Sequence, residues 1–444
     1  MKKIFIKFAL FYIRVLAKIQ LKKINPVVIG VGGASGKTSV SRFIYLILKE
    51  KYKVRVGFGK NSETGIPLSI LNITIQNYNL FNWAGVFVLA LLKVLFDWKK
   101  YDIFICEMGI DGPFEPKNMS YLLKIVSPEL SVLTNISLEH SVYFDPLVKD
   151  EDFKKRKEKI LDLISSQESL IVTSLGKNQT AVVNLDDSET IKILKNIKAR
   201  VVSVSLEKPN ADFYVKSIES SLKEFRLTFV SQKKEYEVKI SNPLPNHFAY
   251  SFLQAIAVSL DFEFTIEEAI TALEKNFFLP PGRMSVFEGV KNTTIIDSSY
   301  NNATLYPLLD ILEMLKKIGE KNHRVAILGD MRELGSVGRE LHEAVADKII
   351  TTCDLAIIIG PLMEQLVAPV LKKNKFNYYS YPNFSNAKKD LLNIISENDL
   401  ILVKSSQNTL FLERAVEMLL KNPKDSVRLC RRGEFWDKKR EKSL

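Results

Sequence analysis

A glycine-rich loop near the start of the chain carries the residue types that bind a nucleoside triphosphate. An apolar run, 26–29, precedes it, and a periodic apolar segment, 40–48, follows it. This order predicts a strand, a loop and a helix, with backbone N–H groups and the helix dipole facing a phosphate. A lysine in the loop supplies charge to the β- and γ-phosphates, and a hydroxyl after it supplies a ligand for Mg²⁺. The residues that we expect to contact ATP are Gly33, Ala34, Ser35, Gly36, Lys37, Thr38 and Ser39.

The glycine spacing of this loop is G-x-x-G-x-x-G-K-[ST], because Val31 stands where the usual phosphate loop has a glycine. A glycine-rich turn that binds nothing is the structural alternative. Four glycines that end in Gly-Lys-Thr at a helix start favour the nucleotide site.

A carboxylate and a histidine follow two further predicted strands. Glu107 ends the run from Asp102, and His140 comes five residues after the run from Leu130 to Asn135. In an open parallel sheet, ligands lie at the carboxyl ends of the strands, so Glu107 is expected near the triphosphate and its metal. A lone histidine is more often structural, and the residue types alone leave both roles open for His140.

A polar loop after the predicted strand at 54–57 contains Asn61 and Thr64. Loops of this composition, punctuated by glycine and proline, commonly face a substrate, and an ordinary turn is the alternative.

These motifs resemble the Mur ligase family, the ATP-dependent amide-forming ligases of cell-wall precursor synthesis. The loop spacing, N-x-E-x-G-x-P-L from Asn61 and T-N-I-x-x-x-H from Thr134 carry the resemblance in the first half. In the second half, G-D-M-R-E-L-G from Gly329 points to the MurF branch. The resemblance covers about residues 26–420.

The resemblance implies a set of site residues. Thr38, Glu107 and His140 would bind magnesium, and Lys157, carbamylated, would hold a second magnesium. Lys157 is the match to the lysine of Y-x-x-A-K-x-x-I, although Lys154, Lys155 and Lys159 lie nearby. The implied catalytic set is Lys37, Glu107, His140 and Lys157. Further implied contacts are Asn184, Arg283 and Asp297 for ATP, and Asn61, Thr64, Asn135, Tyr300, Asn301 and Lys404 for substrates.

Several positions depart from the family pattern. Phe248 and Ser251 replace two asparagines that usually contact adenine, and Gln407 replaces an arginine. The separate N-terminal domain that holds the UDP-sugar in MurF proteins has no counterpart in residues 1–25. These departures leave the two substrates open.

The predicted fold class is α/β, with a central P-loop ATPase domain built on a mostly parallel sheet and a C-terminal doubly wound, Rossmann-like α/β domain. The expected divisions are a basic amphipathic helix, 1–25, the central domain, 26–279, the C-terminal domain, 280–423, and a basic tail, 424–444. Residues 200–241 alternate apolar and polar positions, which predicts a small antiparallel excursion.

Charge and cysteine content exclude some classes of function. The formal net charge is +12, but residues 1–25 and 421–444 account for all of it, so the body of the protein is neutral and no nucleic-acid partner is expected. Three widely spaced cysteines argue against a disulfide framework or a zinc site and favour a cytoplasmic setting.

Two apolar stretches raise the idea of membrane contact. Residues 1–25 form a basic amphipathic helix that suits an anionic membrane surface or packs on the protein body, and the two interpretations weigh equally. Residues 80–98 are too short to span a bilayer and predict a buried or interfacial helix. A location at the inner face of the membrane is therefore an alternative within the cytoplasmic one.

The expected function is an ATP- and Mg²⁺-dependent, ADP-forming ligase that adds D-Ala-D-Ala to a UDP-muramoyl tripeptide through an acyl phosphate. The expected partners are small molecules: a nucleotide-linked or lipid-linked peptide acid, and an amino acid or dipeptide amine. The alternatives are a Mur-type ligase for a different acid and amine, and a nucleotide-binding homologue without turnover.

Overall fold

The structure is a computed structural model that describes residues 2–75, 80–150, 152–300, 304–406 and 410–441. Contacts divide the chain into two compact units. The first unit comprises Met1–Ser217, Leu227–Val238 and Phe248–Phe277, and the second comprises Ile218–Arg226, Lys239–His247 and Phe278–Leu444. The change of unit at 277/278 lies close to the expected division at 279/280. The two short segments that join the second unit were not anticipated from the sequence.

The first unit is built on a nine-stranded sheet in the order β2-β3-β1-β4-β5-β6-β7-β8-β9. Neighbouring strands from β2 through β7 pair in parallel. The strands are β1 (Val27–Gly32), β2 (Val54–Val56), β3 (Ile103–Glu107), β4 (Leu130–Leu133), β5 (Thr180–Asn184), β6 (Arg200–Ser205), β7 (Phe213–Ser220), β8 (Phe225–Ser231) and β9 (Lys234–Ile240).

The expected antiparallel excursion over 200–241 needs a correction. Its first strand, β6, pairs in parallel with β5 and continues the main sheet. A hairpin comes later, because only Gln232 and Lys233 separate β8 from β9 and both have positive φ, as a two-residue hairpin turn requires. Alternation alone could not distinguish a sheet-edge strand from a hairpin strand.

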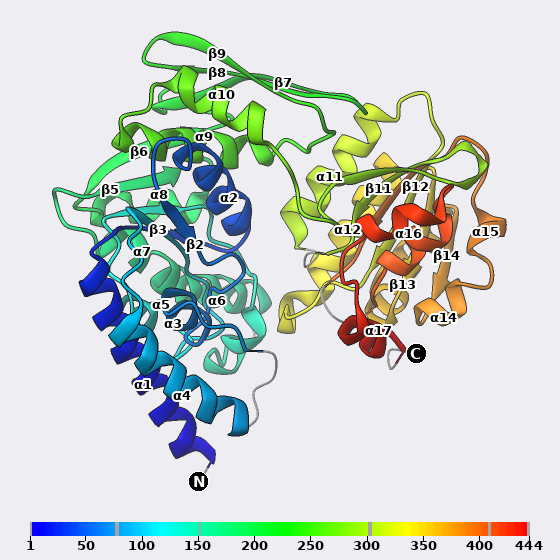
Figure 1. Cartoon of the computed structure of the whole chain (residues 1–444). Coiled ribbons are helices and arrows are strands. Elements are labelled where there is room, and N and C mark those ends of the chain that lie inside the picture. The colour runs from blue at the N-terminus through cyan, green and yellow to red at the C-terminus, as the bar shows by residue number, and fades with distance from the viewer. Residues whose placement is uncertain (1, 76–79, 151, 301–303, 407–409, 442–444) are drawn as a thin grey trace. The chain divides into compact units, whose positions relative to one another are not determined.

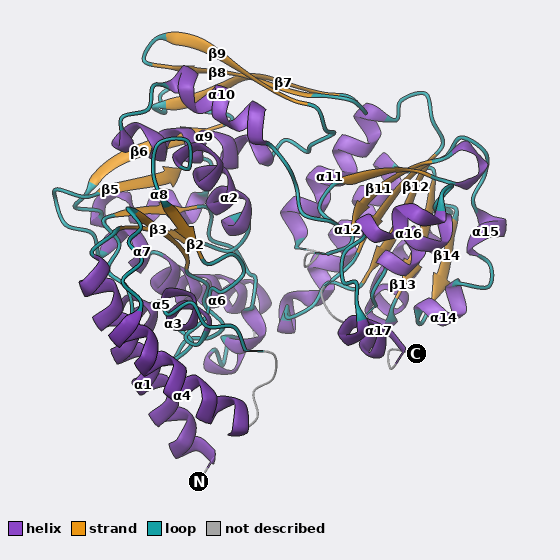
Figure 2. Cartoon of the chain, in the orientation of Figure 1, coloured by secondary structure: helices purple, strands orange, loops and turns teal. Residues whose placement is uncertain are grey.

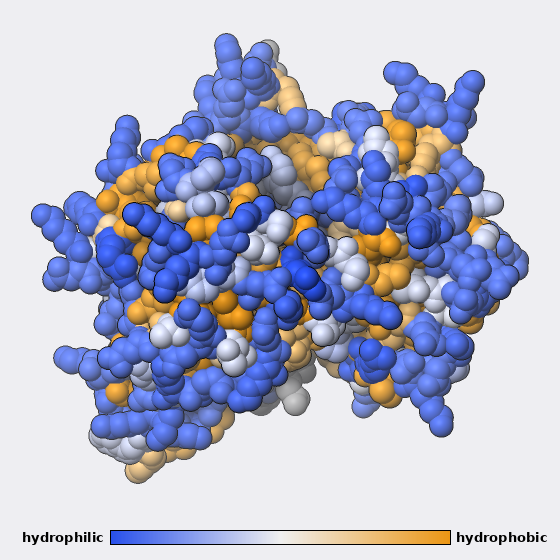
Figure 3. Space-filling model, turned by 90° about the horizontal axis from the view of Figure 1, so that it is seen from above, coloured by the Kyte–Doolittle hydropathy of each residue, from blue (hydrophilic) through white to orange (hydrophobic). Residues whose placement is uncertain are grey.

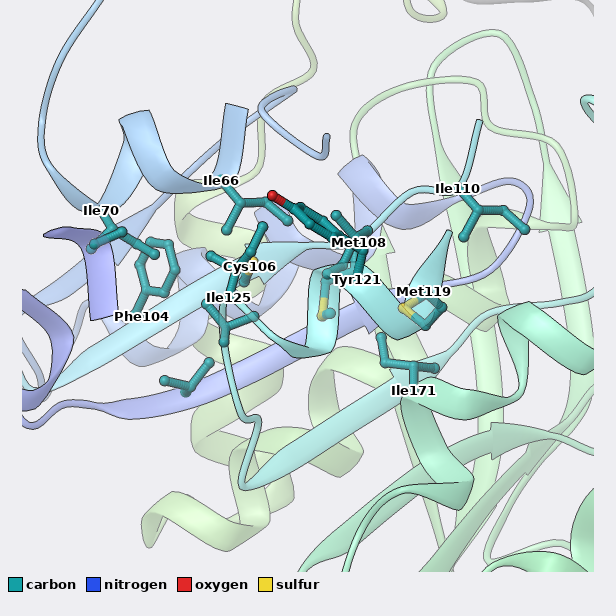
Figure 4. Close-up of a cluster of buried hydrophobic side chains, with 14 of the residues drawn as sticks. Ile66, Ile70, Phe104, Cys106, Met108, Ile110, Met119, Tyr121, Ile125 and Ile171 are labelled. Atoms are coloured by element: carbon teal, nitrogen blue, oxygen red, sulfur yellow. The ribbon is translucent and has the colours of Figure 1, made fainter. Parts of the chain in front are cut away.

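Helices cover the parallel part of this sheet (Figure 2). They are α1 (Lys2–Ile24), α2 (Lys37–Leu48), α3 (Gly65–Ile70), α4 (Leu80–Phe96), α5 (Met119–Leu123), α6 (Phe153–Glu168), α7 (Leu170–Thr173), α8 (Ser188–Ile193), α9 (Phe248–Ser259) and α10 (Ile266–Asn276). Figure 4 shows part of the core, in which Ile66 and Ile70 of α3, Phe104 and Cys106 of β3, and Tyr121 of α5 meet. No helix in the described part of this chain is long and apolar enough to cross a membrane.

The order in which the chain adds strands to the sheet reverses at β1. β2 and β3 lie on one side of β1, and β4 lies on its other side. Such a reversal opens a crevice at the carboxyl ends of the strands, where ligands bind in open α/β sheets. The segments that follow β1, β3 and β4 therefore meet at one place.

The second unit contains a six-stranded sheet in the order β10-β11-β15-β12-β13-β14, parallel except at β10. Its strands are β10 (Ser285–Glu288), β11 (Thr294–Ser298), β12 (Arg324–Gly329), β13 (Leu355–Ile359), β14 (Tyr378–Tyr381) and β15 (Leu400–Lys404). Its helices are α11 (Leu305–Ile318), α12 (Gly338–Thr352), α13 (Ala368–Lys373), α14 (Phe384–Ala387), α15 (Leu391–Ile394), α16 (Glu413–Leu419) and α17 (Glu434–Glu441). The α/β class expected from the sequence is confirmed, although short strands β10 and β14 were missed.

The segment 424–444 is not a free basic tail in its described part. Arg431 is buried, and its side chain pairs with Glu413 at 2.9 Å with 1% and 0% of the two side chains exposed. The composition of this segment showed its positive charge, but not that a buried acid pairs with one of its arginines.

Candidate active site

The phosphate loop connects β1 to α2, and glycine is required within it. Gly33 has φ of 110° and Gly36 has φ of 85°, a region that favours glycine. A Cβ atom at Gly33 would also lie 2.7 Å from the carbonyl oxygen of Asn135. The helix α2 starts directly after this turn at Lys37, so its free N–H groups face the loop.

Asn135 holds the loop in shape. Its backbone carbonyl accepts from Ala34 N at 2.9 Å, and its side-chain Oδ1 accepts from Ser35 N at 3.0 Å. The resemblance assigned Asn135 to substrate contact, which stays a prediction, and the structure adds its contact with the nucleotide loop. We therefore interpret Asn135 as a residue that positions the loop.

Lys37 lies folded over the loop that precedes it. Its Nζ donates to the carbonyl oxygens of Gly33 and, at 2.6 Å, of Ala34. The ammonium group is therefore held against the backbone of the glycine-rich loop.

Thr38 and Glu107 come together at the carboxyl ends of β1 and β3. Thr38 Oγ1 donates to Glu107 Oε2 at 3.0 Å, and Gly59 N donates to Glu107 Oε1 at 3.4 Å. Glu107 is 1% exposed. A hydroxyl and a carboxylate beside a phosphate loop are the hard oxygen ligands that Mg²⁺ prefers.

The loop that contains Asn61 and Thr64 joins this end of the sheet. The carbonyl oxygen of Asn61 accepts from Gly109 N at 3.0 Å, two residues beyond Glu107. Thr64 is the residue before α3, and its side chain makes no capping hydrogen bond. Both remain candidates for substrate contact on the strength of their position.

Glu168, at the end of α6, is a site residue that the sequence interpretation missed. Its Oε2 accepts from Gly33 N at 3.1 Å, and the residue is 3% exposed. Burial raises the pKa of Glu168 from 4.5 to about 7, against the lowering effects of Lys37, the Gly33 N–H and His140. The sequence did contain a signal for its burial. Glu168 lies eight residues after Ile160 and four after Ile164, which places it on the buried face of the helix.

Lys157 lies apart from the end of α6, whereas His140 is close enough to Glu168 for its charge to lower the pKa of that carboxyl. His140 has φ of 59° and precedes a short 3-10 helix, Ser141–Tyr143. Lys157 is half-buried and lies eleven residues before Glu168, which is about 16 Å along a helix axis. The residue of α6 that contacts the loop is therefore Glu168, and the metal role of Lys157 stays a prediction.

The other lysines of α6 differ from Lys157 in exposure. Lys154, Lys155 and Lys159 are exposed. Lys159 pairs with Asp150 at 2.8 Å, and the neighbouring Arg156 pairs with Asp145 at 2.8 Å.

Asn184 ends β5, and its Oδ1 accepts from Asp186 N at 2.9 Å. Asp186 in turn accepts from Tyr250 of α9 at 2.8 Å. Asp187 caps α8 and accepts from Ile136 N at 3.2 Å. The N-x-D-D stretch thus builds the turn after β5, and the ATP contact of Asn184 stays a prediction.

The positions of the two replaced asparagines are buried in the contact between α2 and α9. Phe248 is 7% exposed and its ring centroid lies 6.3 Å from that of Phe43, while Ser251 is 5% exposed. Neither residue offers a polar side chain at the surface for adenine.

The second unit gathers its predicted residues in one cluster. Asp297 is the last residue but one of β11 and is fully buried; its Oδ1 accepts from Ser299 N at 3.0 Å. Burial raises the pKa of Asp297, against hydrogen bonds from Ser299 and the charges of Arg431 and Lys404. Within the described residues, its Oδ2 has no hydrogen-bond partner. A buried carboxylate oxygen of this kind is a group that a ligand can use.

Tyr300 and Arg283 contact one another, and Lys404 lies close enough to Asp297 for its charge to lower the pKa of that carboxyl. Tyr300 N donates to the carbonyl oxygen of Gly282 at 3.0 Å, and the guanidinium of Arg283 lies 5.4 Å from the Tyr300 ring. Lys404, 2% exposed, pairs across the strands with Ser298. Asn301 lies outside the described residues.

Arg431 is the second residue that the sequence interpretation missed. Beyond Glu413, it donates to the carbonyl oxygens of Ser299 at 3.4 Å and Tyr300 at 2.7 Å. It therefore fixes the backbone that carries Tyr300. A positive residue within a basic terminal run gave no signal of this role.

Comparisons with known proteins agree with this geometry. Residues 31–259 match the family described as Mur ligase middle domain, and residues 282–407 match the Mur ligase, glutamate ligase domain. The chain is 23% identical over 423 residues to the UDP-N-acetylmuramoyl-tripeptide–D-alanyl-D-alanine ligase of Bacillus subtilis, covering 92% of this chain and 79% of that protein.

Two solved structures share the fold. MurF from Acinetobacter baumannii matches with a TM-score of 0.74 and 18% identity, over 92% of this chain and 80% of that one. MurF ligase from Thermotoga maritima, solved in complex with ADP, matches with a TM-score of 0.71 and 23% identity, over 91% and 83%.

The fold and the phosphate site therefore define a P-loop enzyme that uses a nucleotide. The chain belongs to the Mur ligase family, the ATP-dependent amide-forming ligases whose motifs it carries. The family resemblance and the enzyme class predicted from the sequence are confirmed.

Proposed function

We propose that this chain is a MurF-type ligase that joins D-Ala-D-Ala to the free carboxylate of a UDP-N-acetylmuramoyl tripeptide, with ATP converted to ADP and phosphate. The observation that carries the proposal is the meeting of Lys37, Thr38 and Glu107 at the ends of β1 and β3. The likeness to D-alanyl-D-alanine-adding ligases over 92% of this chain supports the choice of substrates.

The reaction would proceed in two steps. The acid's carboxylate oxygen attacks the γ-phosphorus, the bond to ADP breaks, and an acyl phosphate forms. The amine nitrogen then attacks the acyl carbon, phosphate leaves, and the nitrogen loses a proton. Lys37 and the loop N–H groups stabilise the charge on the transferred phosphoryl group.

The residues at the loop fit a magnesium ion. Among the described residues, no group of three or more His, Cys, Asp or Glu side chains forms a metal cage. Mg²⁺ usually takes one or two carboxylates and completes its shell with phosphate and water oxygens, and Thr38 with Glu107 meets that need. We propose Thr38, Glu107 and His140 as its protein ligands, and the carbamate of Lys157 as a ligand of a second magnesium. The metal would neutralise charge on the phosphates.

The cluster in the second unit holds the remaining residues that the sequence predicted. We propose that Arg283 and Asp297 contact ATP and that Tyr300, Asn301 and Lys404 contact substrates. The buried, unsatisfied Oδ2 of Asp297 supports a ligand contact there.

The second candidate function is a Mur-type ligase that acts on a different acid. The most specific form of this candidate uses a lipid-linked peptide acid at the inner face of the membrane. The observation that favours it is the large number of exposed apolar side chains on α1 and α4.

The test is ADP formation with candidate acid and amine pairs, in the wild type and in Lys37→Ala. The wild type should form ADP only when both substrates are present, and Lys37→Ala should lose at least about a hundredfold in rate. Lys177→Ala, an exposed lysine of the same unit, is the matched control and should keep full activity. Undiminished turnover in Lys37→Ala would exclude the proposal, and turnover with another acid would favour the second candidate.

A further inference from the structure

Helix α1 has two apolar faces, and only one is covered. Leu10, Ile13, Leu16 and Ala17 belong to the core of the first unit. On the opposite side a stripe of larger apolar side chains stays in solvent: Ile4 (74% exposed), Phe8 (54%), Phe11 (55%), Val15 (37%) and Ile19 (46%). Their spacing places them on one face of the helix. The packing interpretation of α1 therefore holds for the covered face, and the membrane interpretation stays a prediction for the exposed one.

Helix α4 packs along α1 (Figure 1). Tyr12 donates its hydroxyl to the carbonyl oxygen of Phe87 at 3.0 Å, and Lys23 donates to that of Val94 at 2.6 Å. The ring of Phe8, part of the exposed stripe, lies 5.9 Å from that of Phe87. The stripe on α1 therefore continues onto α4.

The outer face of α4 is entirely apolar. Val86 and Ala90 point into the core. The exposed side chains are Val88 (61%), Leu89 (48%), Leu91 (46%), Leu92 (43%), Leu95 (52%) and Phe96 (73%). At 100° per residue they cover an arc of about 160° that contains no charged residue. We call these residues, with the stripe on α1, the α1–α4 surface.

Exposed apolar surface of this extent marks an interaction site, because its contact with water is unfavourable. On the face of the molecule seen in Figure 3, by contrast, hydrophobic residues lie in patches broken by hydrophilic ones.

The border of the α1–α4 surface is cationic. Lys7, Lys18 and Lys22 of α1 are exposed, and so are Lys99 and Lys100 after α4. Residues 1–49 contain no Asp or Glu. The acid near the end of α4, Asp97, is already paired with Lys93 at 3.6 Å.

We propose that the α1–α4 surface lies in the headgroup region of an anionic membrane, with α4 inserting its outer face. A basic border around an apolar face is complementary to anionic lipid and acyl chains. A second copy of this chain would instead bring the same lysines together without acids to pair them. Exposed Trp98, with Lys23 Nζ 4.4 Å from its ring, is placed to anchor at the interface.

This inference deepens the proposed location and does not depend on which amide is formed. It assigns the main insertion to α4, where the sequence pointed to residues 1–25. The α4 residues are also outside the phosphate site, so binding and catalysis can be separated.

The test is co-sedimentation of the full chain with vesicles of phosphatidylglycerol and phosphatidylcholine in equal parts, or of phosphatidylcholine alone. The wild type should bind the anionic vesicles. Leu92→Glu with Leu95→Glu should lower the partition coefficient about tenfold or more, because two leucines that the membrane would bury are lost. Lys18→Glu with Lys22→Glu should lower it on anionic vesicles only.

Val427→Glu is the matched control, since Val427 is an apolar side chain that is 80% exposed in the second unit. It should bind as the wild type does. ATP turnover and melting temperature should be unchanged in all variants, which separates this test from that of the ligase activity. Absence of vesicle binding by the wild type, or equal binding by the Leu92/Leu95 variant, would overturn the proposal. So would a wild-type dimer in solution that the same variant converts to monomer.

Discussion

The carboxylate of Glu168 accepts a hydrogen bond from the backbone N–H of Gly33 at 3.1 Å, although 135 residues separate them in the chain. The contact places a buried acid under the loop that binds phosphate, close to Lys37. Its pKa, raised by burial to about 7, makes the charge of this region depend on pH in the physiological range.

The first prediction concerns stability and pH. Because the folded-state pKa of Glu168 lies above its ordinary value of 4.5, the folded chain holds the extra proton between pH 4.5 and about 7. Its contribution to the free energy of unfolding is therefore largest below pH 4.5 and falls by about 3 kcal/mol as pH rises to 7. Glu168→Gln keeps the shape and removes the charge, so it should be more stable than the wild type at pH 8.

Urea unfolding of the ligand-free chain at pH 5, 6, 7 and 8 measures this difference. The stability gap between Glu168→Gln and the wild type should grow with pH and level off above 7. A gap that stays constant across this range would contradict the raised pKa.

The second prediction concerns the magnesium requirement. Glu107→Gln can still accept the hydrogen bond from Thr38, but it removes the negative charge. The Mg²⁺ concentration for half-maximal ADP formation should therefore rise by about tenfold or more. Glu129→Gln alters an exposed acid at the start of β4 and should leave the Mg²⁺ dependence unchanged. An unaltered Mg²⁺ dependence in Glu107→Gln would remove Glu107 from the metal site.

These residues also show what the sequence could predict. Thr38 and Glu107 could be paired in advance, because the carboxyl ends of parallel strands share one edge. Glu107 ends β3, and Thr38 lies at the start of α2, just after the loop that follows β1. Glu168 could not, since a helix pattern shows that a position is buried but not which loop it meets across the fold. The partner of Arg431 could not be predicted for the same reason. The sequence shows that Arg431 is positively charged, but only the tertiary structure brings it to Glu413.

The third prediction concerns the buried pair of Arg431 and Glu413. Arg431→Met leaves a buried carboxylate without its partner and frees the carbonyls of Ser299 and Tyr300, so it should cost about 3–5 kcal/mol of stability in the second unit. The double variant Arg431→Met with Glu413→Leu should recover a large part of that loss, because no buried charge is left unpaired.

Arg432→Met is the control for this cycle. Arg432 pairs with Glu417 at 2.8 Å, but 27% and 39% of these side chains are exposed, so its loss should cost about 1 kcal/mol or less. Thermal unfolding followed by the fluorescence of the three tryptophans, of which Trp436 lies in the second unit, measures all four proteins. Equal losses of stability in Arg431→Met and Arg432→Met would show that the burial of the Arg431–Glu413 pair does not add to its effect on stability.

The fourth prediction decides which residue of α6 serves the metals. A lysine ammonium cannot hold a cation, whereas a carbamate formed from the neutral amine and CO₂ presents two anionic oxygens to Mg²⁺. Lys157 is half-buried, while Lys154, Lys155 and Lys159 are exposed. If Lys157 is carbamylated, Lys157→Ala should lose ADP formation and regain part of it when acetate is added, since acetate can occupy the vacated volume. The three exposed lysines should tolerate alanine.

The competing assignment follows from the contact of Glu168 with the loop. Glu168 already supplies a carboxylate there, and Lys157 lies about three turns earlier on the same helix. On that assignment, Lys157→Ala stays active and needs no acetate, while Glu168→Ala loses activity and regains part of it with acetate. Measuring ADP formation in both alanine variants, with and without acetate and with chloride as the salt control, separates the two. Rescue confined to Lys157→Ala would establish the carbamate, and rescue confined to Glu168→Ala would show that this chain replaces it with a glutamate.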